Sequence, residues 1–223
     1  MNVAIDGPAG AGKSTIAKEA SKRLGFLYVD TGALYRAIGL FVLKSEIALD
    51  DVEGIIGVLP KISLSLAYKD GRQIVLLNQK DVSEEIRLPE ISMAASAVSP
   101  IAEVRRFLLE LQRDIAKKNF VVMDGRDIGT VILPDSEVKI FLTASDETRA
   151  KRRYDELVQK GMDVSFETVL EDIRKRDMQD YTRKEAPLKR ANDAYILDTS
   201  ELTLEESIQA VIDLIKRSRK GNE

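Results

Sequence analysis

The stretch GPAGAGKST, residues 7–15, decides how the first part of the chain folds. It follows a short apolar run (NVAI, residues 2–5) and precedes a segment with apolar residues at helical spacing (IAKEASKRLG, residues 16–25). These pieces predict a strand, a glycine-rich loop and a helix, which is the context that gives the pattern G-x-x-x-x-G-K-[ST] its meaning. The residues that match the pattern are Gly7, Gly12, Lys13 and Ser14.

Such a loop is suited to holding phosphate. Glycines let backbone N–H groups turn inward around anionic oxygens, and the following helix adds its free N–H groups and the positive end of its dipole. Lys13 is expected to reach the β- and γ-phosphates, and the Ser14 hydroxyl is expected to bind Mg²⁺. A glycine-rich turn without a ligand is the alternative. The residues predicted to cradle a nucleoside triphosphate are Gly7, Pro8, Ala9, Gly10, Ala11, Gly12, Lys13, Ser14 and Thr15.

Composition narrows the chemistry. The chain has 223 residues, enough for one sizeable core with a smaller insert, and a net charge of −3 that gives no general basic field for nucleic acid. It contains no cysteine and no histidine, which excludes disulfides, thiolate sites and imidazole as a base or a metal ligand. The start MNVAIDG lacks the basic region of a signal peptide, and no apolar stretch is long enough for a membrane span. We therefore expect a cytoplasmic protein.

Apolar runs alternate with helical patterns over much of the chain. The strand candidates are NVAID, FLYVD, FVVMD, VKIFLTA and AYILDT. A helix is predicted over about residues 14–24, with Gly25 as its end, and another follows the second strand. A final helix is predicted from the spacing of Leu204, Ile208, Val211, Ile212 and Ile215. This alternation indicates an α/β fold with a parallel sheet.

Two regions depart from that rhythm. In the first, over about residues 61–86, Ile62, Leu64, Leu66 and Tyr68 alternate with smaller or polar residues before a KDG turn, which predicts an inserted antiparallel hairpin.

The second region, residues 146–190, is helical in composition and unusually charged. Its apolar stripe is formed by Phe166, Val169, Leu170 and Ile173. The next stripe position is Asp177, and from there charge is predicted to cover every face up to Pro187. Because a helix without an apolar stripe is not part of the core, we interpret this region as a projecting lid. A solvated surface helix is the alternative.

A phosphate-binding glycine-rich loop of this kind is called a P-loop, and three classes of P-loop protein compete as interpretations of this chain. A GTPase switch needs N-K-x-D, and the nearest string, NQKD at residues 78–81, has the letters in another order. A mechanical or nucleic-acid ATPase usually carries a second domain or a basic surface, and neither is evident in this sequence. A small-molecule kinase needs a second phosphate site, which arginine serves well because its guanidinium fork binds phosphate oxygens bidentately.

Several arginines are placed where a second phosphate site is expected. Arg36 follows the second strand, and Arg126 and Asp127 follow the run FVVMD, at the strand ends where open α/β sheets bind ligands. Asp124 ends that run in the manner of a Walker-B acid, with a simple turn-capping role as the alternative.

The charged region holds two more groups of arginines. Arg149, Arg152 and Arg153 are three and four residues apart and so share a helical face. The same holds for Arg176, Asp180 and Arg183. Surface ion-pair ladders have a similar pattern, but the missing apolar stripe favours contact with a substrate.

The motifs DGPAGAGKST, DTGALYRA, DGRDIGTVILPD, VKIFLTAS, RAKRR and RKRD…R…APL, taken in order, resemble those of the bacterial cytidylate kinases along nearly the whole chain. The resemblance implies transfer of the γ-phosphoryl group of ATP to CMP or dCMP with Mg²⁺. It implies a P-loop kinase fold with a five-stranded parallel sheet, a monophosphate-binding insert and a helical lid. The implied division of a single domain, 1–223, is a core (about 1–30, 104–145 and 188–223), a monophosphate-binding region (about 31–103) and a lid (about 146–187).

The resemblance also assigns residues to roles. Asp30, Thr31 and Arg36 correspond to the monophosphate site, and Arg126 corresponds to a contact with the acceptor phosphate. Ser96, Arg105 and Asp127 correspond to positions that read cytosine. In the lid, Arg152 and Arg153 are assigned to the ATP side. The residues expected to act in catalysis are Lys13, Arg126, Arg176 and Arg183, and Asp180 joins the last two beside the substrate.

Two alternatives stay open: a P-loop kinase of another small anionic acceptor, and a nucleotide-binding switch without acceptor turnover. The partners implied are small molecules, with no nucleic acid, membrane or protein partner. Oligomeric state, the relative use of CMP, dCMP and UMP, and the acid that orients Mg²⁺ are not decided by the sequence.

Overall fold

The structure is a computed structural model that describes residues 1–69 and 72–220. It divides into two compact units. Unit 1 combines Met1–Phe26 with Phe120–Glu223, and unit 2 is Leu27–Asn119.

A five-stranded sheet has the strand order β2-β6-β1-β7-β8. Its strands are β1 (Asn2–Asp6), β2 (Leu27–Asp30), β6 (Val121–Gly125), β7 (Val138–Thr143) and β8 (Tyr195–Asp198). β1 pairs in parallel with β6 and β7, and β7 pairs in parallel with β8. The α/β class and all the strands predicted from apolar runs are confirmed. β1 and β6 are almost wholly buried, which is why their sequences are continuously apolar rather than alternating.

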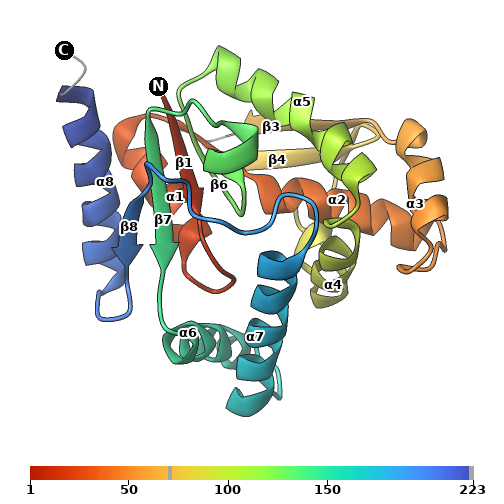
Figure 1. The fold of residues 1–223 in the computed structure, drawn as a ribbon. Helices are drawn as coiled ribbons and strands as arrows, with labels where there is room; N and C mark the ends of the chain where they lie inside the picture. Colours follow the sequence, from red (N-terminus) through yellow and green to blue (C-terminus); the bar gives the residue numbers. More distant parts are fainter. Residues whose placement is uncertain (70–71, 221–223) are drawn as a thin grey trace. The chain divides into compact units, whose positions relative to one another are not determined.

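The helices of unit 1 are α1 (Lys13–Leu24), α6 (Asp146–Gln159), α7 (Phe166–Thr182) and α8 (Leu204–Lys220). α1 ends at Gly25, as the sequence predicts, and the Gly25 N–H donates to Ser21 O. α1 packs against α8. Of the predicted apolar face of α8, Ile208, Val211, Ile212 and Ile215 are buried, whereas Leu204, in the first turn of the helix, is exposed. In Figure 1, α8 lies beside the edge strand β8.

Unit 2 contains the helices α2 (Thr31–Lys44), α3 (Val52–Val58), α4 (Pro89–Val98) and α5 (Ala102–Lys118), with the 3₁₀ turns η1 (Leu59–Lys61) and η2 (Glu85–Arg87). The strands β3 (Leu64–Lys69) and β4 (Arg72–Leu77) form the predicted antiparallel hairpin, and the short β5 (Lys80–Asp81) extends it. Of the predicted KDG turn, residues 70 and 71 lie outside the described residues.

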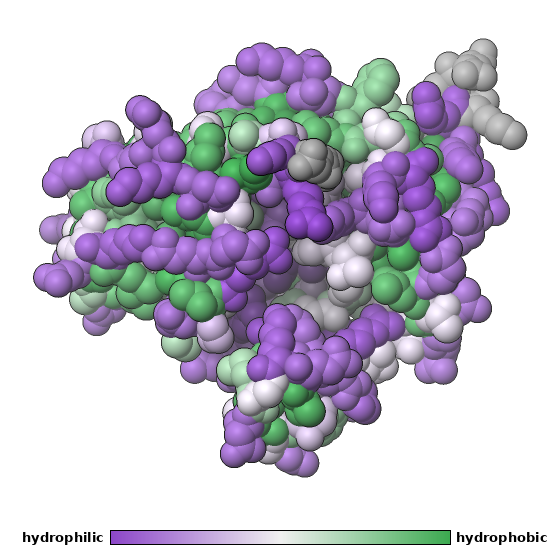
Figure 2. Space-filling view, turned by 180° about the vertical axis from the view of Figure 1, so that it is seen from behind, coloured by the Kyte–Doolittle hydropathy of each residue, from purple (hydrophilic) through white to green (hydrophobic). Residues whose placement is uncertain are grey.

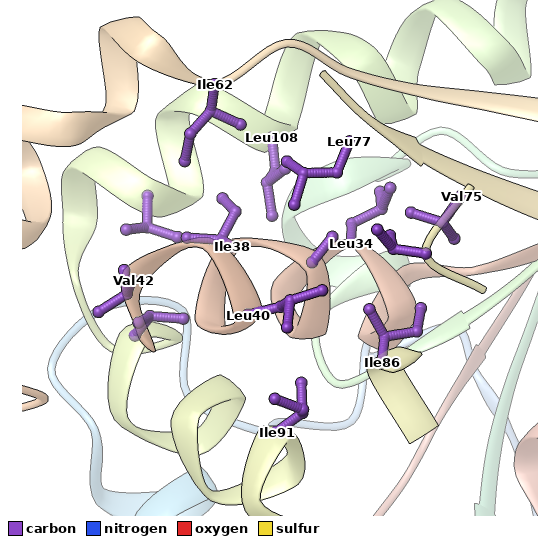
Figure 3. Close-up of a cluster of buried hydrophobic side chains, with 14 of the residues drawn as sticks. Leu34, Ile38, Leu40, Val42, Ile62, Val75, Leu77, Ile86, Ile91 and Leu108 are labelled. Carbon is purple, nitrogen blue, oxygen red and sulfur yellow. The ribbon is translucent and has the colours of Figure 1, made fainter. Parts of the chain in front are cut away.

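The core of unit 2 is built around α2. Leu34 and Ile38 on this helix are fully buried, and Figure 3 shows them among side chains from the hairpin, α4 and α5, such as Leu77, Ile91 and Leu108. This packing holds α2, which carries Arg36, in a rigid setting.

The hairpin is also fastened to the end of β2 by side chains. The Gln73 side chain accepts from Asp30 N–H at 2.9 Å and donates to Asp30 O at 3.3 Å. The Tyr68 hydroxyl donates to Tyr28 O at 3.1 Å. The insert therefore supports the backbone that carries Asp30.

α6 and α7 pack on each other around a small core of Ala150, Val169 and Ile173. Figure 2 shows mainly hydrophilic side chains over these two helices, at the bottom of that view. The sequence predicts that α7 leaves the core where its apolar stripe ends, at Asp177, and this is wrong at Asp177 itself, which is buried. The charged side chain can occupy that position because Arg149, also buried, forms an ion pair with it.

Among residues 1–69 and 72–220, no helix combines the length and the apolar character needed to cross a bilayer.

Asp6, at the end of β1, fixes the segment that follows β6. Its carboxylate accepts from Ile128 N–H at 2.7 Å and from Gly129 N–H at 2.8 Å, at the start of the π-helical turn η3 (Ile128–Ile132). Burial raises the pKa of Asp6 to about 6, against the lowering effect of these two hydrogen bonds. The folded state therefore holds the Asp6 proton more tightly than the unfolded chain does.

This difference predicts a pH dependence of stability. The contribution of Asp6 is fully present below the unfolded pKa of 3.8 and is lost as the pH rises through the folded pKa of about 6. Lowering the pH from 7 to 5 should therefore add about 1.4 kcal/mol to the free energy of unfolding through this group. Urea denaturation gives the free energy of unfolding of the wild type and of Asp6→Asn at both pH values. The contribution of Asp6 is the change between pH 7 and pH 5 in the wild type minus the same change in the variant. An equal pH dependence in both would contradict the assignment.

Candidate active site

The glycine-rich loop leaves β1 and enters α1 as the sequence predicts. Gly7 has φ +152°, and a Cβ placed on it would lie 1.9 Å from Leu142 O in β7, so no other residue fits there. α1 begins after Gly12 without a side-chain cap. Its first turn therefore presents backbone N–H groups to an anion at the loop.

Lys13 is a buried cation under this loop. Its side chain is 5% exposed, and its ammonium group donates to Pro8 O at 2.6 Å. Burial, and then the charge of Arg126, hold the pKa of Lys13 below its ordinary value, while Asp124, Asp180 and Asp6 oppose them. An anion bound at the loop favours the charged form of Lys13.

Ser14 and Asp124 meet at the same place. The Ser14 hydroxyl donates to Asp124 Oδ2 at 2.8 Å, and Asp124 is a buried residue of β6. The sequence leaves open which acid orients a metal, and the structure brings this one to the P-loop hydroxyl. A hydroxyl and a carboxylate are hard oxygen donors of the kind that Mg²⁺ prefers, so the pair fits this ion.

A second charged cluster joins the end of β6 to the end of α7. Arg126 Nε donates to Asp180 Oδ2 at 2.6 Å. Arg183 lies 3.6 Å from Asp127 and 3.5 Å from Asp180, measured between guanidinium nitrogen and carboxylate oxygen. Burial lowers the pKa of Arg126, but the charge and hydrogen bond of Asp180 outweigh it and hold that pKa above its ordinary value. The Asp180 carboxylate therefore stabilises the charged form of Arg126.

The remaining predicted lid residues lie on α6 and α7. Arg152 donates to Thr199 Oγ1 at 3.1 Å and to Thr199 O at 2.7 Å, just beyond β8. Arg153 donates to Glu156 at 2.8 Å on the same helix. Arg176 is an exposed residue of α7.

Unit 2 carries its own cluster at the start of α2. Asp30 caps this helix by accepting from Ala33 N–H at 3.0 Å, and its other oxygen accepts from Arg36 Nη2 at 2.7 Å. Thr31 is buried beside it. The buried Nε of Arg36 has no hydrogen-bond partner among the described residues, so the guanidinium group keeps a donor for an anionic ligand.

Ser96 and Arg105 lie on the neighbouring helices of unit 2. The Ser96 hydroxyl donates to Ser92 O within α4 at 3.2 Å. Arg105 on α5 donates to Ser99 O at 3.1 Å, and its guanidinium carbon lies 5.6 Å from the centre of the Tyr35 ring.

The predicted residues are divided between the two units, and Arg152, Arg153 and Arg176 lie on α6 and α7 outside the charged cluster of unit 1. Unit 1 brings the P-loop together with Asp124, Arg126, Asp127, Asp180 and Arg183. Unit 2 holds Asp30, Thr31, Arg36, Ser96 and Arg105.

The contact of Gln73 with Asp30 was not predicted from the sequence. Arg149 was expected to share a substrate-contacting face with Arg152 and Arg153, but it is buried and pairs with Asp177. A charged residue on an apolar stripe, as at Asp177, is the signal that could have indicated a buried ion pair.

Comparison with known proteins shows what this arrangement is similar to. A profile described as Cytidylate kinase matches residues 3–217. The chain is 53% identical to the cytidylate kinase of Caldicellulosiruptor saccharolyticus over 214 residues, covering 96% of this chain and 95% of the relative. It is 54% identical to that of Caldanaerobacter subterraneus subsp. tengcongensis over 221 residues, covering 99% and 97%.

Among solved structures, an uncharacterized protein from Eubacterium ventriosum is similar in fold, with a TM-score of 0.55 at 14% identity and coverage of 97% of this chain and 98% of that one. The match of the family profile over nearly the whole chain, together with relatives of more than 50% identity, confirms the predicted family. The chain belongs to the cytidylate kinase family.

Proposed function

We propose that the chain transfers the γ-phosphoryl group of ATP to CMP or dCMP with the two residue groups described above. The observation that carries the assignment of residues is the buried Lys13 under the P-loop, in the same unit as the guanidinium groups of Arg126 and Arg183. In phosphoryl transfer the protein forms few or no covalent bonds with the reactants. It aligns them and stabilises the charge of the transferring group. A site made of buried cations and backbone N–H groups provides both.

The donor side is assigned to the P-loop. Residues 7–15 hold the triphosphate of ATP through backbone N–H groups, and Lys13 stabilises the charge of the transferring group. Ser14 and Asp124 would hold Mg²⁺, which shields the phosphate charges when it is bound. Arg152 and Arg153 on α6 are assigned to the ATP side as well.

The acceptor side is assigned to Asp30, Thr31 and Arg36, with Arg126 as the contact to the phosphate of CMP. The buried, unpartnered Nε of Arg36 supports this assignment, because a phosphate oxygen can accept from it. The attacking oxygen belongs to a monophosphate that is already ionised. The reaction therefore needs no histidine or other strong base, which agrees with a chain that has none.

The base is assigned to Ser96, Arg105 and Asp127. A carboxylate accepts from the amino group of cytosine, as Asp and Glu do at cytosine N4 in nucleic acids. Asp127 is buried, and a hydrogen bond made in such a setting is stronger than one made in water. Arg105 can only donate and would bind the acceptor edge of the ring.

Residues 146–187 are proposed as a lid, and residues 31–103 as the monophosphate-binding region. The lid would exclude water, which otherwise accepts the γ-phosphoryl group. Arg176, Asp180 and Arg183 on it are assigned to the transferring group and the substrate. The substrates are free nucleotides, which agrees with a cytoplasmic setting.

Lys13→Ala tests the donor site. The charge of Lys13 counts most as the γ-phosphoryl group transfers, so kcat should fall by about two orders of magnitude or more. Steady-state assays with saturating ATP and CMP measure it. Lys18→Ala, at an exposed position of the same helix, is the matched control and should keep normal kcat. Near-normal kcat in a folded Lys13→Ala variant would overturn the assignment.

Asp127→Ala tests the base site. If Asp127 binds the amino group of cytosine, its loss should lower kcat/KM for CMP more than for UMP, because uracil has no such donor. The ratio of the two kcat/KM values should then narrow by about tenfold, the scale of one lost polar contact. If Asp127 only supports neighbouring arginines, both substrates lose activity by the same factor. An unchanged ratio would therefore end the claim that this carboxylate reads the base.

A further inference from the structure

Arg149 and Asp177 form a buried ion pair, and neither residue is among those assigned to ATP or CMP. Arg149 on α6 is 3% exposed and Asp177 on α7 is 8% exposed. Arg149 Nη1 donates to Asp177 Oδ2 at 2.5 Å. Isolated buried ion pairs contribute little net stability, because removing two charges from water offsets their attraction. The pair therefore calls for another role.

Both members of the pair contact the P-loop at one residue. Asp177 Oδ1 accepts from Ala9 N–H at 3.1 Å, and Arg149 Nη1 donates to Ala9 O at 2.7 Å. The backbone of Ala9 is thus held on both sides by charged groups. Hydrogen bonds to charged partners are stronger than neutral ones.

The next loop residue is packed against the same two helices. Gly10 has φ +73°, and a Cβ placed on it would lie 3.2 Å from Arg149 Cβ and 3.3 Å from Ile173 Cδ1. The tip of the P-loop therefore rests on α6 and α7 at the ion pair, and its left-handed backbone at Gly10 fits against them.

The arginine is itself anchored to the sheet. Arg149 Nε donates to Ala144 O at 3.0 Å, just after β7, and Arg149 Nη2 is paired with Asp146 at the start of α6. All these contacts lie within unit 1. The guanidinium group connects the end of β7, α7 and the P-loop.

We propose that Arg149 and Asp177 are positioning residues that hold the P-loop in its phosphate-binding conformation. The proposal rests on the donor role of the P-loop stated under Proposed function. A glycine-rich loop loses more backbone entropy on ordering than other segments do. Contacts that order it in advance lower the cost of binding ATP. Asp177 also links the loop to α7, the helix that carries Arg176 and Asp180.

The test replaces the pair without leaving a lone buried charge. In Arg149→Met with Asp177→Leu, apolar side chains fill the space, and such replacements of buried pairs are often neutral for stability or stabilising. We expect KM for ATP to rise about tenfold, the scale of a modest misplacement at a site, while KM for CMP at saturating ATP changes less than about twofold. Steady-state kinetics, with the urea midpoint measured alongside, give both values.

A second variant covers a failure of the double variant to fold. Arg149→Lys keeps the charge beside Asp177 but loses the fork that reaches Ala9 O, and we expect a smaller rise in KM for ATP with CMP unaffected. Arg174→Met is the matched control: Arg174 also bridges α7 to α6, through Asp146 and Glu147, but it is exposed and belongs to neither the P-loop contacts nor the assigned site. It should leave both KM values unchanged.

The outcomes separate the two claims. Wild-type KM for ATP in a folded double or Arg149→Lys variant would overturn the positioning role, whatever the activity of the wild type. Equal rises in KM for ATP and CMP that follow the loss of stability would mean a structural role only, and would overturn it too. A wild-type enzyme that does not phosphorylate CMP would instead contradict the proposed function.

Discussion

The burial of a lysine ammonium group beneath a glycine-rich loop is the constraint on which the rest of unit 1 depends. Lys13 lies almost out of contact with water, and the positive charge of the half-buried Arg126 acts on it. Such charges are costly to bury unless anions or oriented dipoles accompany them. Asp124 and Asp180 partly supply them in the protein itself, and in the proposed function the phosphates of ATP supply the rest. A bound anion would favour the charged form of Lys13.

The parallel sheet explains how distant parts of the chain meet there. The P-loop follows β1, and Asp124, Arg126 and Asp127 lie at or just beyond the end of β6, which pairs with β1 residue by residue. Carboxyl ends of neighbouring parallel strands lie at the same edge, where ligands of α/β sheets bind. α7 is connected to the P-loop by Asp177, which accepts a hydrogen bond from Ala9 N–H. This contact brings the charged end of α7 to the same edge of the sheet. In unit 2, packing around α2 holds the helix that carries Arg36. Gln73 holds the backbone of Asp30, whose carboxylate pairs with Arg36.

Local patterns in the sequence were sufficient to predict the large sheet and the P-loop. Apolar runs predicted every strand of the large sheet, because strands buried on both faces need continuous apolar residues. The P-loop spacing predicted Lys13 and Ser14, since that motif is local. Contacts between distant residues had no such signal. The ion pair of Arg149 with Asp177 spans 28 positions. Asp177 was interpreted as the end of the apolar stripe of its helix, because a charged residue is rarely buried unless it is paired. Likewise, nothing in the hairpin pattern indicated that Gln73 would hold Asp30.

The account is tested most directly by a coupled kinase assay of the purified wild type with ATP and each common ribo- and deoxyribonucleoside monophosphate in turn. A site of buried cations with a carboxylate for the cytosine amino group predicts kcat/KM values for CMP and dCMP well above that for UMP, and little use of purine monophosphates. Binding of ATP without turnover of any acceptor, or a preference for a purine or another acceptor over CMP, would contradict it.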